Sequence, residues 1–470
     1  MSEILYLIFN VYLIFVIIYF LGVNIIYSLF LAVSFKEIFN HMRHNAFVDY
    51  RKLIQSEFTY SVSVLAPAYN EGKTVVESVK SLLKLNFGKY EVLVINDGSQ
   101  DDTLEQLIHE FDLTKTNQFY YDVIKTKPVR GIFISQKPEY KNLTIIDKEN
   151  GGKADSLNAG INIARYDFVC CIDADSILED DALLKSMKPF HEDKTVVAVG
   201  GIIRIANGCK VINGRVVSVG LSHKLLPIFQ VVEYLRAFLS GRMFWNIFQG
   251  PLIISGAFGI FKKSILLEVG GYRIDTVGED MELVTRIHRT MIEKKKPYKV
   301  LFVPDPVCWT EAPDSLSVLS RQRNRWQRGL LDTLLIHKKM MFNPRYGIVG
   351  IGALPHFLFV ELLGPVFEAM GYISLVVMYS LGVLNIDIAI LFFIVALFYG
   401  AMFSVGAVIL EEISFQRYPK PSDLALLLSI GIIENFGYRQ LTVVWRLKGI
   451  FDYLRGHKHW GTMQRKGFRI

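Results

Sequence analysis

The chain has 470 residues and a formal net charge of +7 at pH 7; 51% of its residues are hydrophobic and 21% are charged. Its mean hydropathy of +0.30 is unusual for a soluble protein, in which polar residues normally hold the average lower. The basic excess gathers beside apolar segments and forms no stripe in the central part of the chain. Composition therefore points to a membrane and excludes nucleic acid as an expected partner.

A long uncharged stretch opens the chain. Residues 4–35 contain no charged side chain, and these 32 residues would extend about 48 Å as a helix, more than the ~30 Å hydrocarbon core of a membrane. A secretory signal peptide would be shorter, would begin with a basic leader and would end at a small-residue cleavage site. Glu3 is the only charge before the stretch, so we expect a retained transmembrane helix here.

Two further uncharged stretches, residues 369–386 and 388–410, lie near the other end of the chain. Residues 424–433 are also apolar, but Glu434 and Arg439 soon follow them. The central part has the composition of a globular domain and ample length for a core of its own. The expected organisation is an N-terminal transmembrane helix at 1–40, a globular domain at 41–330, interfacial and transmembrane helices at 331–446, and a basic tail at 447–470.

Basic residues flank the apolar stretches. Lys36, Arg43 and Arg51 follow the first stretch, and seven lysines and arginines crowd the tail after residue 445. Because positive residues in short flanks stay on the cytoplasmic side, we expect a multi-pass protein of the cell (plasma or inner) membrane with the domain and tail in the cytoplasm. An even number of crossings must then follow residue 345. Either residues 424–445 do not cross, or residues 347–367 add a crossing.

Short runs rich in β-branched residues alternate with helical patterns in the central part and end abruptly at polar residues. This alternation predicts an α/β domain with a mostly parallel sheet covered on both faces. In such sheets ligands bind at the carboxyl ends of the strands, where Asp97, Asp173 and Asp175 stand, so we expect a nucleotide site there. The predicted strands are residues 61–67, 90–95, 142–146 and 167–172.

Asp173 and Asp175 stand one residue apart directly after a predicted strand. Strand alternation would point both carboxylates the same way, and carboxylate oxygens are the ligands that Mg²⁺ and Mn²⁺ prefer. Substrate phosphates would complete the coordination of such a metal, which would offset charge on a leaving diphosphate. An isolated Asp-x-Asp is more often a simple polar turn, so the interpretation depends on the other motifs.

Three other segments each have a functional and a plain structural interpretation. Residues 148–160 form a glycine-bearing loop entering a helix, which would suit an anionic ligand through its amides and Lys153, or would only cap the helix. Asp280 is either part of a helix cap or a general base that accepts a hydroxyl proton. Arg325 and Trp326 are either an interface anchor or a diphosphate ligand beside a flat platform for a sugar.

In this order and spacing, the motifs resemble those of the processive family 2 glycosyltransferases: the cellulose, chitin, hyaluronan and poly-N-acetylglucosamine synthases. The resemblance runs from about residue 62 to residue 328 and implies a GT-A-like nucleotide-sugar-binding domain inserted between transmembrane helices. Asn96 and Gly278 depart from the better-known members. By resemblance, the donor-binding residues are Pro67, Tyr69, Glu71, Asp97, Lys153, Asp173, Gln322 and Arg325, the metal ligand is Asp175, the catalytic base is Asp280, and the acceptor-binding residues are Glu279 and Trp326.

The resemblance implies an inverting glycosyltransferase that uses a UDP-sugar and Mg²⁺ or Mn²⁺ to elongate a β-linked polysaccharide at the cytoplasmic face, coupled to export through the membrane. The alternative is transfer of one or a few sugars to a lipid acceptor. Accessory export proteins are further candidate partners. Residues 255–258 and 311–313 are candidates for sugar selection, and Trp245, Trp309 and Trp326 either stack along the export route or pack in the core.

Overall fold

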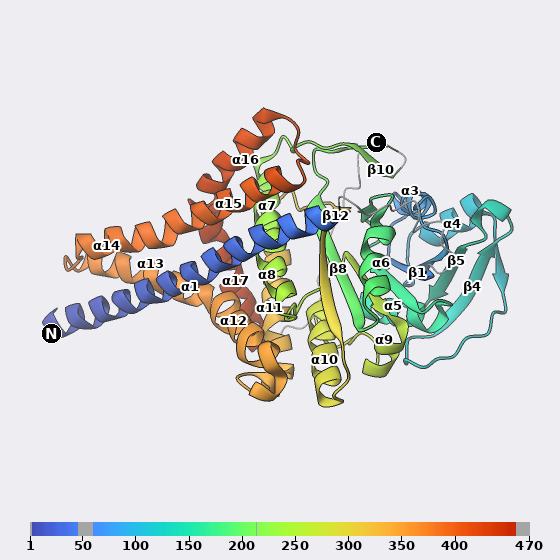
Figure 1. The fold of residues 1–470 in the computed structure, drawn as a ribbon, viewed down its shortest axis with the longest axis horizontal. Helices are drawn as coiled ribbons and strands as arrows, with labels where there is room; N and C mark the ends of the chain where they lie inside the picture. Colours follow the sequence, from blue (N-terminus) through green and yellow to red (C-terminus); the bar gives the residue numbers. More distant parts are fainter. Residues whose placement is uncertain (1, 46–59, 213, 457–470) are drawn as a thin grey trace. The chain divides into compact units, whose positions relative to one another are not determined.

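A computed structural model places residues 2–45, 60–212 and 214–456 (Figure 1). The chain divides into two compact units, which we call the sheet unit and the helical unit. Among the described residues, the sheet unit comprises those within His44–Ser222 and Gln249–Ala312, and the helical unit comprises those within Met1–Arg43, His223–Phe248 and Pro313–Thr462. Two segments that the sequence assigned to the globular domain, 223–248 and 313–330, thus cluster with the apolar helices.

The sheet unit is built around a mixed sheet. Among the described residues its ten strands run in the order β3-β4-β5-β2-β1-β6-β11-β8-β12-β7. The central strands β5, β2, β1 and β6 are parallel, whereas β11 is antiparallel to both β6 and β8. The four predicted strands appear as β1, β2, β5 and β6, so the expected α/β domain with a mostly parallel centre is confirmed. The strand bounds are β1 Val62–Ala68, β2 Tyr90–Asn96, β3 Leu113–Thr116, β4 Val129–Ser135, β5 Leu143–Lys148, β6 Phe168–Ile172, β7 Ile177–Leu178, β8 Val196–Ile205, β11 Phe258–Lys262 and β12 Lys299–Thr310.

Apolar residues explain why this sheet forms. All residues of β6 and β8 are buried, as expected for strands covered on both faces. Leu65 of β1 and Ile95 of β2 share one core cluster with Leu157, Leu266 and Ile287, which come from three different helices. The helices of this unit are α3 Val75–Leu82, α4 Thr103–Phe111, α5 Lys153–Ile163, α6 Ala182–Glu192, α9 Lys263–Val269 and α10 Glu279–Glu293.

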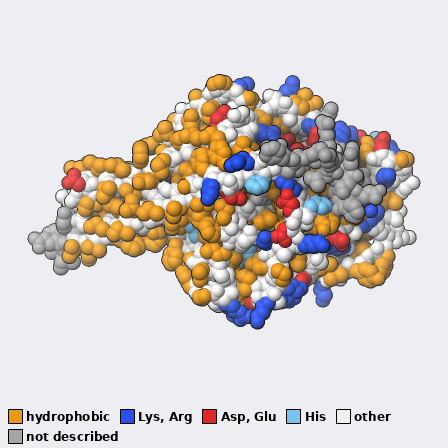
Figure 2. Space-filling view, in the orientation of Figure 1, with side chains coloured by type: hydrophobic (Ala, Val, Ile, Leu, Met, Phe, Trp, Pro, Cys, Tyr) orange, Lys and Arg blue, Asp and Glu red, His pale blue; other side chains and the backbone are white. Residues whose placement is uncertain are grey.

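The helical unit contains three helices long and apolar enough to cross a membrane, among the residues that are placed. They are Leu7–Asn45, Val349–Ser380 and Ile386–Ser414. Large hydrophobic side chains cover the outer surface of these helices (Figure 2). The main helices of the unit are α1 Ser2–Asn45, α7 Leu225–Leu235, α8 Met243–Ile247, α11 Leu316–Ile336, α13 Gly364–Ser380, α14 Ile386–Phe393, α15 Tyr399–Ser414, α16 Pro421–Ile433 and α17 Tyr438–Leu454.

These lengths bear on the two alternatives for the membrane crossings. Residues 347–367 form no separate span, because most of them begin the long helix Val349–Ser380. The 13-residue helix α16 measures about 20 Å, which is short of the ~30 Å hydrocarbon core. Among the described residues, two long apolar helices therefore follow residue 345, an even number, and the number of membrane crossings stays a prediction.

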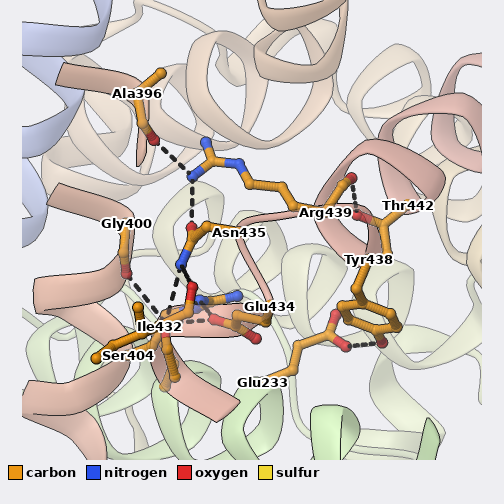
Figure 3. A network of polar contacts seen from close by, with 12 residues as sticks. Glu233, Ala396, Gly400, Ser404, Ile432, Glu434, Asn435, Tyr438, Arg439 and Thr442 are labelled. Carbon is orange, nitrogen blue, oxygen red and sulfur yellow. Dashed lines mark hydrogen bonds and ion pairs between the residues drawn. The ribbon is translucent and has the colours of Figure 1, made fainter. Parts of the chain in front are cut away.

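Polar contacts connect the helices of the helical unit. Figure 3 shows Ser404 beside Glu434, and Arg439 beside the carbonyl oxygen of Ala396 and the side chain of Asn435. Arg236, directly after α7, lies 2.5 Å from Glu434 at the end of α16, and Ser404 of α15 donates a hydrogen bond to the same carboxylate. Arg439 of α17 lies 2.9 Å from Glu368 of α13. The charged side chains thus neutralise one another between helices, which is how charges are accommodated in an apolar environment.

Candidate active site

Strand pairing in the sheet unit brings three predicted site residues together. Because β11 runs antiparallel to β6 with Phe258 opposite Ile172, the residues before β11 lie beside those after β6. Lys153 opens α5, and its Nζ lies 2.5 Å from Asp173 Oδ1 and donates to the carbonyl oxygen of Gly256 at 3.0 Å. The N–H of Gly256 in turn donates to Asp280 Oδ2 at 3.3 Å. Lys153, Asp173 and Asp280 therefore meet around one backbone position.

Glycine at position 256 permits this meeting. A Cβ atom there would lie 2.8 Å from Lys153 Nζ and 3.8 Å from Asp280 Oδ2. The first distance is shorter than real Cβ contacts allow, so any other residue would displace the lysine. Gly256 lies within residues 255–258, which the sequence suggested for sugar selection. Because it has no side chain, Lys153 can approach its backbone.

The charges around Lys153 keep it protonated. Burial alone would lower the pKa of this side chain, but the nearby carboxylates of Asp173, Glu279 and Asp280 outweigh burial and raise the pKa above its ordinary value. Lys153 is therefore a permanent cation at the carboxyl ends of the strands, next to the start of a helix. Both features favour an anionic group such as a phosphate.

Asp280 occupies the first turn of α10. Glu279 is buried, with 6% of its surface exposed, whereas Asp280 is partly exposed. One oxygen of Asp280, Oδ1, accepts from the N–H of Met281 at 2.8 Å. Negative side chains are favoured at a helix N-terminus because the macrodipole is positive there. The structure thus holds a partly exposed carboxylate near Lys153 and Asp173, as a general base requires.

Asp173 and Asp175 follow β6, as the sequence predicted, and both are partly exposed. No group of three His, Cys, Asp or Glu side chains able to hold a metal occurs among the placed residues. Two carboxylates followed by substrate phosphates are nevertheless the usual way in which proteins hold Mg²⁺. The residues present therefore fit a divalent cation that is completed by a ligand.

The loops after β1 and β2 are joined by hydrogen bonds. Gln100 N–H donates to Asn70 Oδ1 at 2.8 Å, and Glu71 N–H donates to Thr103 Oγ1 at 2.9 Å. Glu71 also accepts from Thr74 Oγ1 at 3.0 Å, and Tyr69 is 45% exposed. Among the predicted residues of this motif, Tyr69 is thus accessible to a ligand, whereas Pro67 lies within β1.

Asp97 is buried directly after β2, and its role toward the donor stays a prediction. It is 3% exposed, and its carboxylate accepts from Lys148 Nζ at 2.8 Å and from the N–H groups of Gly151 at 2.9 Å and Gly152 at 2.8 Å. Lys148 also pairs with Asp155 at 2.6 Å. Sequence reasoning missed Lys148 and Asp155, because a Lys beside a polar loop normally indicates a solvent-exposed residue.

The residues of the Q-x-x-R-W motif belong to the helical unit. Gln322, Arg325 and Trp326 lie on α11 at spacings of three and four, which place them on one face of the helix. Trp326 is 44% exposed, and the guanidinium of Arg323 lies 4.3 Å from the centre of its ring. Glu233 holds this guanidinium with an ion pair of 2.7 Å. The roles of these residues toward donor and acceptor stay predictions.

Two of the three tryptophans suggested for the export route are buried. Trp309 of β12 is 1% exposed, and its indole N–H donates to Glu179 at 2.7 Å. Trp245 of α8 is 8% exposed and packs against the rings of Phe30 and His356. Of the two interpretations, stacking along the export route is therefore wrong for Trp309 and Trp245. Both side chains pack in the core.

Comparison with known families gives three matches. A model described as glycosyltransferase-like family 2 matches residues 133–329, and a second, glycosyl transferase family 2, matches residues 63–121. A chitin synthase model matches residues 271–418. Together the two family 2 models match more than half of the chain and include the loops and strand ends described above.

Curated relatives include two poly-beta-1,6-N-acetyl-D-glucosamine synthases. That of Staphylococcus aureus (strain COL) is 30% identical over 274 residues, which cover 58% of this chain and 55% of the relative. That of Staphylococcus epidermidis (strain ATCC 35984) is 29% identical over 286 residues, which cover 60% of this chain and 58% of the relative. The chain thus spans only a little over half the length of the curated relatives that it matches.

Solved structures resemble the chain more distantly. The mannosyltransferase PcManGT from Pyrobaculum calidifontis, in complex with GDP-Man and Mn²⁺, matches with a TM-score of 0.49 and 17% identity over 88% of this chain and 99% of that one. S. aureus TarS 1–349 in complex with UDP-GlcNAc matches with a TM-score of 0.35 and 14% identity over 84% of this chain and 92% of that one.

The mixed sheet and the family models agree with each other. The two family 2 matches include β5, which precedes Lys153, β6, which precedes Asp173, and helix α10, which carries Asp280. The expected GT-A-like fold is therefore confirmed, and so is the expected class of enzyme. The chain belongs to the family 2 glycosyltransferases.

Proposed function

We propose that this glycosyltransferase uses a UDP-sugar to elongate a β-linked polysaccharide at the cytoplasmic face of the membrane, coupled to export of the product. The observation that carries the proposal is the meeting of Lys153, Asp173 and Asp280 around Gly256. The ammonium group of Lys153, for the diphosphate, and the carboxylate of Asp280, for the acceptor hydroxyl, then lie close together. The chitin synthase match and the two N-acetylglucosamine polymer synthases support a polymer as the product.

Asp280 is the proposed catalytic base. It accepts a proton from the acceptor hydroxyl while that oxygen attacks the anomeric carbon, and the bond from this carbon to the diphosphate breaks. One displacement inverts the configuration, so an α-linked donor gives a β-linked product and no carboxylate nucleophile is needed. Glu279 and Trp326 are the proposed acceptor-binding residues.

The donor is proposed to bind across the strand ends. The proposed residues at the nucleoside end are Pro67, Tyr69, Glu71 and Asp97. Lys153 and Arg325 are proposed to hold the diphosphate, and Asp173 and Gln322 are further proposed donor-binding residues. A lysine and an arginine supply charge-assisted hydrogen bonds that strengthen as negative charge builds on the leaving group.

Asp175, with Asp173 beside it, would hold the divalent cation, either Mg²⁺ or Mn²⁺. When bound, such a cation supplies positive charge that stabilises the departing diphosphate. Lys153, beside Asp173, would stabilise the same diphosphate through its positive charge. The metal and the lysine would therefore share the charge of one diphosphate.

The proposed location is the cell membrane, with several crossings and the sheet unit in the cytoplasm. Three long apolar helices support the membrane, and the basic flanks after the first span and in the tail support the orientation. UDP-sugars are made in the cytoplasm, so this orientation would give the site access to its donor. Accessory export proteins remain proposed partners.

Incubation of the full-length protein, reconstituted in lipid vesicles, with a panel of UDP-sugars and Mg²⁺ or Mn²⁺ tests the proposal. UDP release identifies the donor, and the names of the relatives make UDP-N-acetylglucosamine the first to try. Products are sized before and after digestion with a matching glycosidase. A long digestible polymer is expected. A short, organic-soluble glycolipid would contradict the polymer and support the alternative acceptor, and release from no donor would contradict the proposal as a whole.

A further inference from the structure

A buried arginine joins three helices of the helical unit. Arg323 of α11 is 3% exposed, and its Nη2 donates to Glu233 Oε2 of α7 at 2.7 Å. The hydroxyl of Tyr438, the first residue of α17, donates to the same oxygen at 3.0 Å (Figure 3). Charge-assisted hydrogen bonds of this kind are strong, so Glu233 fixes where the guanidinium lies. The proposed function gives Arg323 no role.

The guanidinium of Arg323 lies over the ring of Trp326. Its central carbon is 4.3 Å from the centre of that ring, within the ~6 Å at which a cation is attracted to an aromatic face. The two residues are three positions apart on α11, which makes them neighbours on one face of the helix. Arg323 therefore covers one face of the indole.

Aromatic rings of α7 complete the surroundings of this pair. The ring centre of Tyr234 lies 6.5 Å from that of Trp326, with the two planes at 44°. Phe229 stacks on Tyr438, with ring centres 4.7 Å apart and the planes at 9°, so the tyrosine that contacts Glu233 is itself held by packing. Trp326 nevertheless stays 44% exposed, which leaves part of the indole at the surface.

Restraint of an exposed ring matters for binding. An exposed tryptophan without such neighbours can adopt several side-chain rotamers, and a ligand that stacks on it must first order the ring. A guanidinium that a carboxylate holds in place restrains the ring before the ligand arrives. Because the guanidinium lies against one face, the other face is left for the ligand.

We propose that Arg323, Glu233 and Tyr438 form a support, here called the ring support, that holds the indole of Trp326 in one orientation. The open face of the indole then accepts a sugar ring of the acceptor. Arg323 is a positioning residue for acceptor binding, and Glu233 and Tyr438 act through it. The inference rests on the proposed function, because it takes Trp326 as an acceptor-binding residue.

Arg323→Lys and Glu233→Gln are the main variants. Lysine keeps the positive charge but has no planar group to stack on the indole, and glutamine removes the charge that holds the guanidinium. We expect each variant to raise KM for the acceptor about threefold to tenfold, with kcat at saturating acceptor and the affinity for UDP nearly unchanged. An unchanged KM in both variants would overturn the inference.

The acceptor in these assays is a short β-linked oligosaccharide of the donor sugar that UDP release identifies. It is offered to the full-length protein in detergent, below the unfolding midpoint of each variant. In a Trp326→Ala background, Arg323→Lys should raise KM no further, because the ring on which Arg323 acts is gone. Full additivity of the two changes would overturn the inference.

Glu368→Gln is the matched control. Like Glu233, Glu368 belongs to the helical unit and contacts both an arginine and a tyrosine: it lies 2.9 Å from Arg439 and accepts from the Tyr372 hydroxyl at 2.9 Å. The same substitution therefore removes the same kind of contacts and leaves the ring support in place. We expect its acceptor KM to equal that of the unaltered protein, and an increase as large as that of Glu233→Gln would overturn the inference.

Fluorine NMR tests the ring support without any substrate. The chain has five tryptophans, and in protein labelled with 5-fluorotryptophan the resonance that disappears in Trp326→Phe belongs to Trp326. Its chemical shift should change in Arg323→Lys and Glu233→Gln and stay unchanged in Glu368→Gln. Tyr438→Phe is a milder variant should the others fold poorly, and a smaller change in the same resonance is expected.

A Trp326 resonance that none of the ring-support variants changes would overturn the inference. The same measurement separates a failure of the inference from a failure of the proposed function. If the unaltered protein transferred no sugar to any oligosaccharide, the proposed function would lose its support, while the Trp326 resonance would still decide whether Arg323 holds the ring.

Discussion

Charged side chains gather at the strand ends in the sheet unit, whereas in the helical unit they pair between helices. In the sheet unit, Lys153 and Asp173 pair at the strand ends and keep 17% and 25% of their side chains exposed, so a ligand can reach them. In the helical unit, Arg439 and Glu368 pair between helices α17 and α13, with 29% and 7% of their side chains exposed. The difference teaches that the same residue types serve ligand binding in one region and helix association in the other.

Breaking a pair inside the helical unit should have the largest effect on stability. Glu368→Gln leaves the guanidinium of Arg439 without its carboxylate between helices, and loss of a hydrogen-bond partner to a charged group costs about 1–3 kcal/mol. We expect a clearly lower midpoint of thermal unfolding in detergent. Replacing both residues by Met should recover most of the loss, because two apolar side chains leave no charge uncompensated.

The exposed pair Arg289–Glu293 of α10 provides the control for that experiment. Its side chains are 30% and 37% exposed, and such surface pairs contribute about 0–1 kcal/mol. Glu293→Gln should therefore leave the midpoint nearly unchanged. Equal shifts for Glu368→Gln and Glu293→Gln would contradict the distinction between the two regions.

Removing the ammonium group of Lys153 from the strand ends should lower activity and leave stability nearly unchanged. Lys153→Met takes away the charge that faces the leaving diphosphate, and loss of one such group lowers turnover by about 10²–10³-fold. UDP release from the preferred donor measures the effect. Lys262→Met is the control, because Lys262 donates to Lys194 at the opposite end of β11. Similar losses in both variants would show that Lys153 has no special role.

A buried histidine makes the stability of the sheet unit depend on pH. Nδ1 of His288 lies 2.8 Å from the Tyr298 hydroxyl and Nε2 lies 2.9 Å from the carbonyl oxygen of Pro251, a set that suits the neutral ring. Burial lowers the pKa of His288 to about 4. Below pH 6.5 the unfolded chain therefore binds a proton at His288 that the folded chain does not bind. The free energy of unfolding should fall by about 2 kcal/mol between pH 7 and pH 5.

Unfolding midpoints at the two pH values measure this loss. His288→Gln should remove that part of the pH dependence, because glutamine does not titrate. His109→Gln, at an exposed position of α4, should keep it. A pH dependence that survives in His288→Gln would assign the loss to other groups.

The smallest effect is expected at the exposed aromatic ring of the helical unit. Trp326→Ala removes a 44% exposed platform, and stacking of a ring on an aromatic side chain contributes about 1 kcal/mol. We expect a higher KM for acceptor oligosaccharides and shorter products, while Trp326→Phe should preserve both. Products of unchanged length from Trp326→Ala would remove Trp326 from the acceptor site.

Particular residues show what the sequence could and could not predict. The strand ends at Asp97 and Asp173 were predicted because β-branched runs stop abruptly at polar residues, and the long apolar helices were predicted because they lack charge. The buried position of Lys148 was not, since its partners Asp97 and Asp155 come from segments 51 and 7 residues away along the chain. The sequence left two interpretations open for Trp309, because only the folded sheet shows that its ring is covered.

Replacement of Asp280 by Asn tests the central claim most directly. The measurement is UDP release by the reconstituted protein, together with the affinity for UDP, and Asp275→Asn on the preceding exposed loop is the control. The account predicts a loss of turnover of about 10²–10⁴-fold with UDP affinity nearly unchanged, because Asp280 accepts the acceptor proton and does not hold the nucleotide. Turnover retained in Asp280→Asn would contradict the account.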